Sequence, residues 1–213
     1  MIKRFTLFIC LFYLLFLTWS DQRLLAQDAA TDALAKAQNA AMNALSRAQN
    51  AHSVGDNITA LESIWEAQEA IWNLSPLGVR NVAFVTEPPD EFGIYTPKVG
   101  EEFGQDELLI LYCEPFGYTQ IKEADGTYGY SVIASLSVLD SEGQVLGGND
   151  NLGPYGKTGI RTFNTQFMIF ITLNMRGLEA GSYVLKVTLT DNNDQTKTVQ
   201  MEKPFVRLPD PNT

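Results

Sequence analysis

The residue pattern changes abruptly at residues 75–78, and this change limits the fold more than any other feature of the sequence. Residues 28–74 contain no proline and a single glycine, Gly55. From residue 79 onward apolar and polar residues alternate, and clusters of Gly, Pro, Asn and Asp interrupt them. A long stretch without proline favours helices, whereas alternation is typical of strands. The sequence therefore predicts an α+β protein, with helices first, strands second, and a linker at 75–78.

Residues 27–74 are expected to form an antiparallel helical hairpin. Ten of the twenty-five residues from 28 to 52 are alanine, the residue with the highest helix propensity. After a short break, Asp56 or Asn57 can cap a second helix. Small residues on the first helix allow close approach, and large residues on the second would fill the space between them. The apolar positions three and four residues apart are Leu34, Ala37, Ala41, Leu45 and Ala48 on the first helix and Ile58, Leu61, Ile64, Trp65, Ala67, Ile71 and Trp72 on the second.

The two tryptophans of the second helix are the largest apolar side chains of the hairpin. Trp65 and Trp72 are seven residues apart, so both project from one side of the helix. Large aromatic rings contribute much of the energy of packing and of interfaces. We expect both to dock the hairpin on the next domain or on another subunit; the alternative is a ligand site.

The first 26 residues have the layout of a secretory signal peptide. Lys3 and Arg4 precede an apolar run from Phe5 to Trp19, and Leu24-Leu25-Ala26 provides a cleavage site. The run is short for a membrane span. We expect cleavage after Ala26, with an uncleaved membrane anchor as the alternative.

Cleavage would change the composition of the chain. The segment carries three of the 15 basic residues and one of the 25 acidic residues, which leaves 12 and 24 and a net charge of −12. It also carries Cys10, so Cys113 would remain alone and no intrachain disulfide could form. An exported protein without disulfides fits the bacterial periplasm, or secretion from a bacterium. The acidic charge argues against a nucleic-acid partner.

Residues 79–208 are expected to form one antiparallel β-sandwich of about seven strands, followed by a tail at 209–213. Turn clusters separate the alternating segments, and no helical run lies between them. Residues 147–159 are rich in Gly and Asn and are expected to form a long loop. The predicted strands are Val79–Glu87, Glu107–Glu114, Tyr128–Leu139, Gln144–Leu146, Thr165–Met175, Ser182–Asp191 and Lys197–Val206.

One motif links this domain to a known class of folds. Leu178, a glycine-bearing turn, and Tyr183 at the start of an alternating strand resemble the tyrosine corner of immunoglobulin-like and fibronectin-like domains. The resemblance implies that the Tyr183 hydroxyl bonds back to the turn and that Leu185, Val187 and Leu189 face the core. The usual core tryptophan is missing, because no tryptophan follows Trp72. The usual inter-sheet disulfide is missing as well, because Cys113 has no cysteine partner on the strand Ser182–Asp191. The better comparison is with cysteine-poor immunoglobulin-like modules of exported bacterial envelope proteins, which implies no particular activity.

The segment Glu114-Pro115-Phe116-Gly117-Tyr118 is the strongest binding candidate. Proline and glycine would hold two aromatic rings on a short loop beside a carboxylate, and Tyr155 would lie in the glycine-rich loop at the same end of the sandwich. Rings beside a carboxylate can stack on a sugar or grip a peptide. The interpretation we favour for this segment is nevertheless structural: a corner packed against the hairpin, in which Glu114 bonds to local amides.

Few residues of this sequence can support catalysis or metal binding. There is one histidine, and Cys113 lies in a continuous apolar run that predicts burial. The Asp/Asn-rich segments 149–151 and 191–194 lack the spacing of a calcium loop and are expected to form turns. No cofactor-binding motif is found. We expect no metal or cofactor.

The sequence favours an exported, non-enzymatic binding or structural protein of the bacterial envelope that works through protein contacts. The expected partner is another envelope protein or a second copy of the chain, and membrane contact is expected only if the signal segment remains. One alternative is a carbohydrate-binding module. The other is a small hydrolase that uses paired carboxylates, whose pairing would be spatial and invisible in the sequence.

Overall fold

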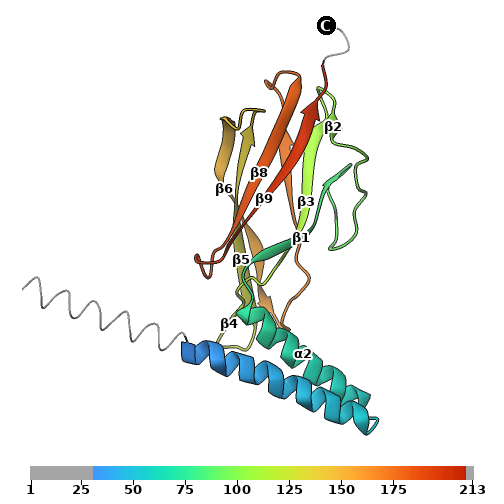
Figure 1. The fold of residues 1–213 in the computed structure, drawn as a ribbon, viewed down its shortest axis with the longest axis vertical. Coiled ribbons are helices and arrows are strands. Elements are labelled where there is room, and N and C mark those ends of the chain that lie inside the picture. The colour runs from blue at the N-terminus through green and yellow to red at the C-terminus, as the bar shows by residue number, and fades with distance from the viewer. Residues whose placement is uncertain (1–30, 210–213) are drawn as a thin grey trace, which may run out of the picture. The chain divides into compact units, whose positions relative to one another are not determined.

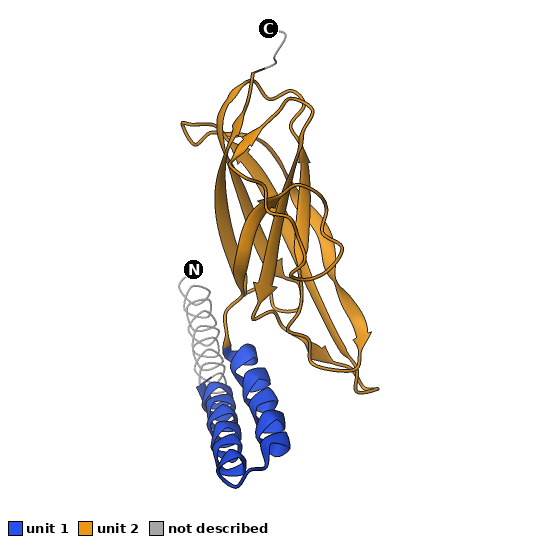
Figure 2. Cartoon of the chain, turned by 90° about the vertical axis from the view of Figure 1, so that its right-hand side faces the viewer, with its two compact units in different colours: residues 1–74 blue, residues 75–213 orange. Residues whose placement is uncertain are grey.

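The computed structural model of the protein describes residues 31–209. The chain divides into two compact units, residues 1–74 and residues 75–213, coloured separately in Figure 2. The expected signal segment, its cleavage site and all but the first residue of the expected tail lie outside the described residues. Two helices come first and antiparallel and mixed sheets follow, so the predicted α+β class is confirmed.

The described part of the first unit, residues 31–74, is a helical hairpin. One helix spans residues 31–53 and the second, α2, spans Asn57–Leu74; Figures 1 and 2 show them side by side. Gly55 adopts a φ of 81° in the turn, a conformation that favours glycine. Asp56 caps α2, because its Oδ1 accepts the Thr59 N–H at 3.1 Å. Hydrogen bonds from Thr59 also lower the pKa of Asp56.

Small residues from both helices close the seam of the hairpin, so the expectation that large side chains of the second helix would fill it is wrong. Leu61, Ile64 and Trp65 are exposed instead. Alanines on one helix can meet small residues on the other at short interaxial distance, and no room then remains between them for a large side chain. The buried seam residues are Ala41, Ala44, Ala48 and Ala51 on the first helix and Ala60, Ser63 and Ala67 on α2.

The second unit consists of two β-sheets with a common core (Figure 1). The smaller sheet has the order β1-β3-β7, and every pairing in it is antiparallel. The larger has the order β2-β9-β8-β5-β4, with β6 also paired to β5. The strands are β1 (Gly78–Val85), β2 (Glu102–Phe103), β3 (Leu108–Phe116), β4 (Ile121–Lys122), β5 (Tyr128–Leu139), β6 (Val145–Ile160), β7 (Ile169–Asn174), β8 (Gly181–Asp191) and β9 (Thr198–Arg207).

The described residues form nine strands, whereas about seven were expected. Two of them, β2 and β4, are two-residue strands, and β2 pairs with β9 in parallel, so the larger sheet is mixed rather than wholly antiparallel. The expected loop at 147–159 is wrong, because these residues belong to β6. A Cβ at Gly148 or Gly156 would overlap a backbone carbonyl of β5. The glycines therefore serve strand pairing there rather than a loop.

Aromatic rings connect the two sheets. Phe84 of β1 packs edge-on against Phe103 of β2, with ring centroids 5.1 Å apart, and Phe103 packs edge-on against Phe205 of β9 at 6.2 Å. Edge-to-face contacts of this kind stabilise a core beyond the area they bury. Cys113 is buried and free, and burial raises the pKa of its thiol to about 12.

The corner at the start of β8 contains the hydrogen bond that the immunoglobulin-like resemblance implies. The Tyr183 hydroxyl donates to the backbone carbonyl of Glu179 at 2.8 Å. Its ring stacks on Phe205, with centroids 5.5 Å apart and planes 28° apart. Leu178 is half-buried in the preceding turn. The alternate residues Leu185, Val187 and Leu189 are buried.

Candidate interaction surfaces

The hairpin presents large apolar side chains on one side. At 3.6 residues per turn, three exposed positions of the first helix and three of α2 lie on the same flank of the seam. No charged residue of either helix lies among them. We call these six residues the apolar face; their exposed fractions run from 42% to 66%, and they are Leu34, Met42, Leu45, Leu61, Ile64 and Ile71.

The charged residues of the two helices gather on the opposite flank of the seam. On each helix they fall within an arc of about 60°, at about 100° per residue. Arg47 and Glu66 form an ion pair across the hairpin, which places these two arcs on one side. The hairpin is therefore amphipathic as a unit. The charged residues are Asp32, Lys36 and Arg47 on the first helix and Glu62, Glu66 and Glu69 on α2.

The two predicted anchor residues have different surroundings. Trp65 is 63% exposed and lies on the outer side of α2, next to the apolar face. Trp72 is buried. Trp65 is thus a large exposed ring at the edge of the uncharged surface of the hairpin. The docking role expected for Trp65 and Trp72 stays a prediction.

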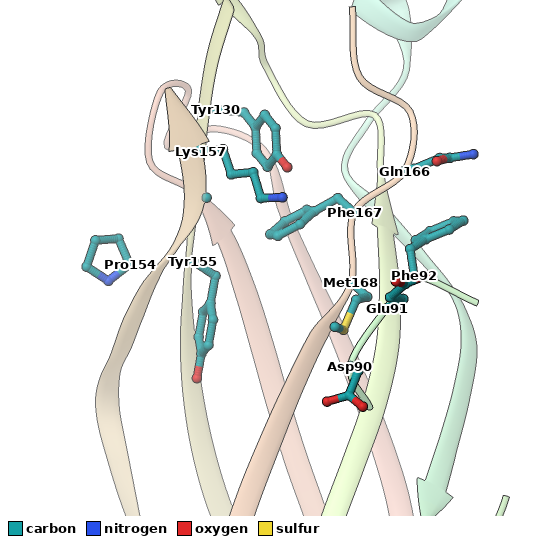
Figure 3. A pocket seen from close by; sticks show the side chains of 11 residues that line it. Asp90, Glu91, Phe92, Tyr130, Pro154, Tyr155, Lys157, Gln166, Phe167 and Met168 are labelled. Atoms are coloured by element: carbon teal, nitrogen blue, oxygen red, sulfur yellow. The ribbon is translucent and has the colours of Figure 1, made fainter. Parts of the chain in front are cut away.

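The β-unit contains a groove of about 560 Å³. Figure 3 shows Pro154 and Tyr155 of β6 on one side, Asp90 and Phe92 on the other, and Met168 between them. Small-molecule sites have volumes of this order and combine apolar walls with a few polar groups. We call it the Tyr155 groove; its lining residues are Asp90, Glu91, Phe92, Tyr130, Pro154, Tyr155, Gly156, Lys157, Gln166, Phe167 and Met168.

A buried carboxylate holds the loop that forms one wall of this groove. Glu114 is 3% exposed, and its Oε1 accepts the Tyr112 hydroxyl at 2.8 Å. The Tyr112 oxygen in turn accepts the backbone N–H of Gly93 at 2.9 Å, next to Phe92. Burial raises the pKa of Tyr112 to about 12, so it is protonated at neutral pH and can donate to the carboxylate.

A bulge in β1 completes the shell around Glu114. The register shifts between Arg80 and Ala83, and Asn81 has a φ of 52°. Arg80 Nε and Asn81 Nδ2 both donate to Glu114 Oε2, at 3.0 and 2.9 Å. Glu114 thus bonds to side chains on β1 and β3, so the favoured expectation that it bonds to local amides is wrong. Through Tyr112, Glu114 is connected to the loop that carries Phe92, a residue that lines the groove.

Tyr118 supports the groove from behind. Its ring lies 4.7 Å from that of Tyr130 and 5.3 Å from that of Phe167, and both of those rings line the groove. Its hydroxyl donates to the Asn164 carbonyl at 2.8 Å. Tyr118 is fully buried, and burial raises its pKa.

The four predicted binding residues therefore do not form one open surface. Tyr155 lines the groove, while Glu114 and Tyr118 lie in the interior behind it. Phe116 is half-buried at the end of β3, where its ring occupies the space that a Cβ on Gly78 would need. Burial prevents direct contact between a ligand in solution and the Glu114 or Tyr118 side chains in this conformation.

The sequence pattern did not indicate the loop residues that line the groove. Asp90, Glu91 and Phe92 lie in the connection between β1 and β2, which runs from residue 86 to residue 101. Loops of this length without secondary structure are uncommon in compact domains and often functional. The length of this connection was the feature of the sequence that could have indicated a functional loop.

The Asp/Asn-rich segments have structural roles. The Asp191 carboxylate accepts the backbone N–H groups of Thr119, Asn193 and Asp194, which joins the turn after β8 to the segment after β3. Asn149 and Asn151 belong to β6, so the expected turn at 149–151 is wrong. Within residues 31–209, no group of three or more His, Cys, Asp or Glu side chains is arranged to hold a metal ion. In the same part of the chain, neither helix has the length and hydropathy that crossing a bilayer requires.

Neither a protein-family model nor a curated protein sequence matches this chain. Among solved structures, CopC from Methylosinus trichosporium OB3b is similar at 16% identity and a TM-score of 0.30, over 53% of this chain and 86% of CopC. The alkylpurine DNA glycosylase AlkC from Pseudomonas fluorescens, bound to DNA with an abasic-site analogue, is similar at 10% identity and a TM-score of 0.33, over 72% of this chain and 39% of that one. The ApaA protein from Bordetella pertussis is similar at 12% identity and a TM-score of 0.26, over 64% of this chain and 95% of ApaA. Likeness at this level transfers no ligand or activity to this chain.

Proposed function

We propose that this chain is an exported, non-enzymatic protein of the bacterial envelope that acts through protein–protein contacts made by the apolar face of its hairpin. The observation that carries the proposal is the distribution of side chains on the hairpin. Small residues close the seam, and six large apolar side chains are exposed together on one flank of it. Contiguous exposed apolar surface on a folded domain marks interaction sites.

The absence of charge on the apolar face supports a protein partner. Interface cores are depleted in charged residues and enriched in apolar and aromatic ones. The charged residues of both helices lie on the other flank, where they keep that side hydrated. Export rests on the signal-like layout of residues 1–26, and the bacterial compartment rests on the single cysteine of the mature chain.

Site-specific photo-crosslinking in living cells tests this proposal. A photoreactive amino acid replaces Leu45 or Ile64 on the apolar face, and Asn43 on the charged flank is the matched control. We expect a crosslinked protein adduct from both face positions and little or none from Asn43. Equal adduct yields at all three positions, or none at the face, would overturn the proposal.

Carbohydrate binding in the Tyr155 groove is a second candidate. Aromatic rings and carboxylates line the same groove, the combination that holds sugars by stacking and by hydrogen bonds. Glycan-array binding should then require Tyr155 and Glu91, and Tyr155→Ala should abolish it. A glycan that binds and is cleaved, with cleavage lost in Asp90→Asn, would instead support the hydrolase alternative. Absence of binding to any glycan would remove both.

A further inference from the structure

We infer that the partner on the apolar face is a second copy of this chain, and that two hairpins pack face to face as a four-helix bundle. The inference rests on the proposed function, because it names the occupant of the same surface. In such a homodimer each hairpin would present the same six residues, Leu34, Met42, Leu45, Leu61, Ile64 and Ile71, to a two-fold axis.

The size of the face matches the lower limit for a specific dimer. The 18 residues of α2 make the hairpin about 27 Å long, at about 1.5 Å per residue. Two adjacent helices of about 10 Å diameter make it about 20 Å wide. One face therefore covers roughly 500 Å², and two copies bury about 1,000 Å², the size at which specific interfaces begin.

The charge distribution also fits a second copy. An isologous interface brings each residue of the face near its own copy or near another residue of the same face, so any charge there would meet a like charge across a short distance. The face contains none, while all six charged residues of the helices point away from it. The acidic mature chain can therefore self-associate through this surface without placing like charges in contact.

The chemistry of the face predicts a weak to moderate dimer. It is large enough for specificity, it is uncharged, and it carries aliphatic side chains rather than aromatic and arginine anchors, which dominate tight interfaces. We expect a dissociation constant in the micromolar range. Trp65 would lie at the edge of this contact, where it remains partly hydrated.

Sedimentation equilibrium of the exported chain over a range of concentrations tests the inference. The wild-type chain should be a reversible dimer. Leu45→Glu and Ile64→Glu, each on the face, should raise the dissociation constant at least tenfold, because two like charges would then be buried near the axis. Asn43→Glu adds the same charge on the opposite flank and should leave the dissociation constant unchanged. Circular dichroism of each variant confirms that the helices remain.

The outcomes separate this inference from the proposed function. A wild-type chain that stays monomeric up to millimolar concentration overturns the second copy as occupant. If that monomer still gives face-specific adducts of higher mass in cells, the partner is a different protein and the proposed function stands. A dimer that persists in Leu45→Glu and Ile64→Glu would also overturn the inference, since its interface would lie elsewhere.

Discussion

Replacing Tyr183 by phenylalanine tests how the β-unit holds its corner. The substitution removes one hydroxyl and leaves the ring, which stacks on Phe205 at 5.5 Å. The lost hydrogen bond to the Glu179 carbonyl is 2.8 Å long and lies at an exposed position. Water can replace the donor there, so we expect a loss of about 1 kcal/mol rather than the larger cost of an unsatisfied buried group.

This loss corresponds to a measurable shift of the unfolding midpoint. The 139 residues of the β-unit have an unfolding entropy of about 0.3 kcal/mol per kelvin, at about 2.1 cal/mol/K per residue. A destabilisation of about 1 kcal/mol then lowers the midpoint by about 3 °C. Tyr183→Leu also removes the stacked ring and should lower it about twice as far.

The assay must report on the β-unit and not on the hairpin. All three tryptophans, Trp19, Trp65 and Trp72, precede residue 75, so tryptophan fluorescence follows the wrong unit. The β-sheet signal in far-UV circular dichroism, or tyrosine fluorescence, is suitable. A Tyr183→Phe variant that unfolds at the wild-type midpoint would show that the hydrogen bond contributes nothing and would refute the corner argument.

Three further predictions follow from the β-unit. Burial raises the pKa of Tyr112 from about 10 to about 12, so folding favours its protonated form. The free energy of unfolding should therefore fall as the pH rises from about 10 to about 12. Denaturant titrations should show a smaller fall for the Tyr112→Phe variant than for the wild-type chain. Burial raises the pKa of the Cys113 thiol to about 12. In a Cys10→Ser chain, a thiol reagent at pH 8 should therefore react with Cys113 only after denaturant is added. Rapid labelling of Cys113 in the folded protein would contradict this. Gly117 and Gly143 have φ of 74° and 82°, but of these two only Gly117 lies where an added Cβ would overlap backbone atoms. Gly117→Ala should therefore lower the thermal midpoint clearly more than Gly143→Ala. Equal losses would mean that backbone strain alone matters.

The class and order of the fold could be predicted because they depend on local patterns. Helix propensity, the cap at Asp56 and the alternation in β8 all act over a few residues, and each agrees with the fold. The corner at Tyr183 is also local, since its hydrogen bond spans four residues.

Other features depend on partners that the sequence does not indicate. Glycine-rich β6 had the composition of a loop, yet Gly148 and Gly156 are glycines because β5 lies against them. The residues that close the seam of the hairpin could not be predicted, because alanine is compatible with both a buried and an exposed helix position. Two of the three side chains that donate to Glu114, those of Arg80 and Asn81, lie more than thirty residues earlier in the chain. Such contacts arise only when the sheets assemble.

Thiol accessibility on the hairpin, compared between cells and dilute purified protein, tests the central claim most directly. In a Cys10→Ser background, Leu45→Cys places a thiol on the apolar face and Asn43→Cys places one on the charged flank, while Cys113 is buried. If a protein covers the face, Leu45→Cys should label at least tenfold more slowly in cells than in dilute solution, and Asn43→Cys should label at similar rates in both. Equal rates for Leu45→Cys in the two conditions would contradict the claim that this face is an interaction surface.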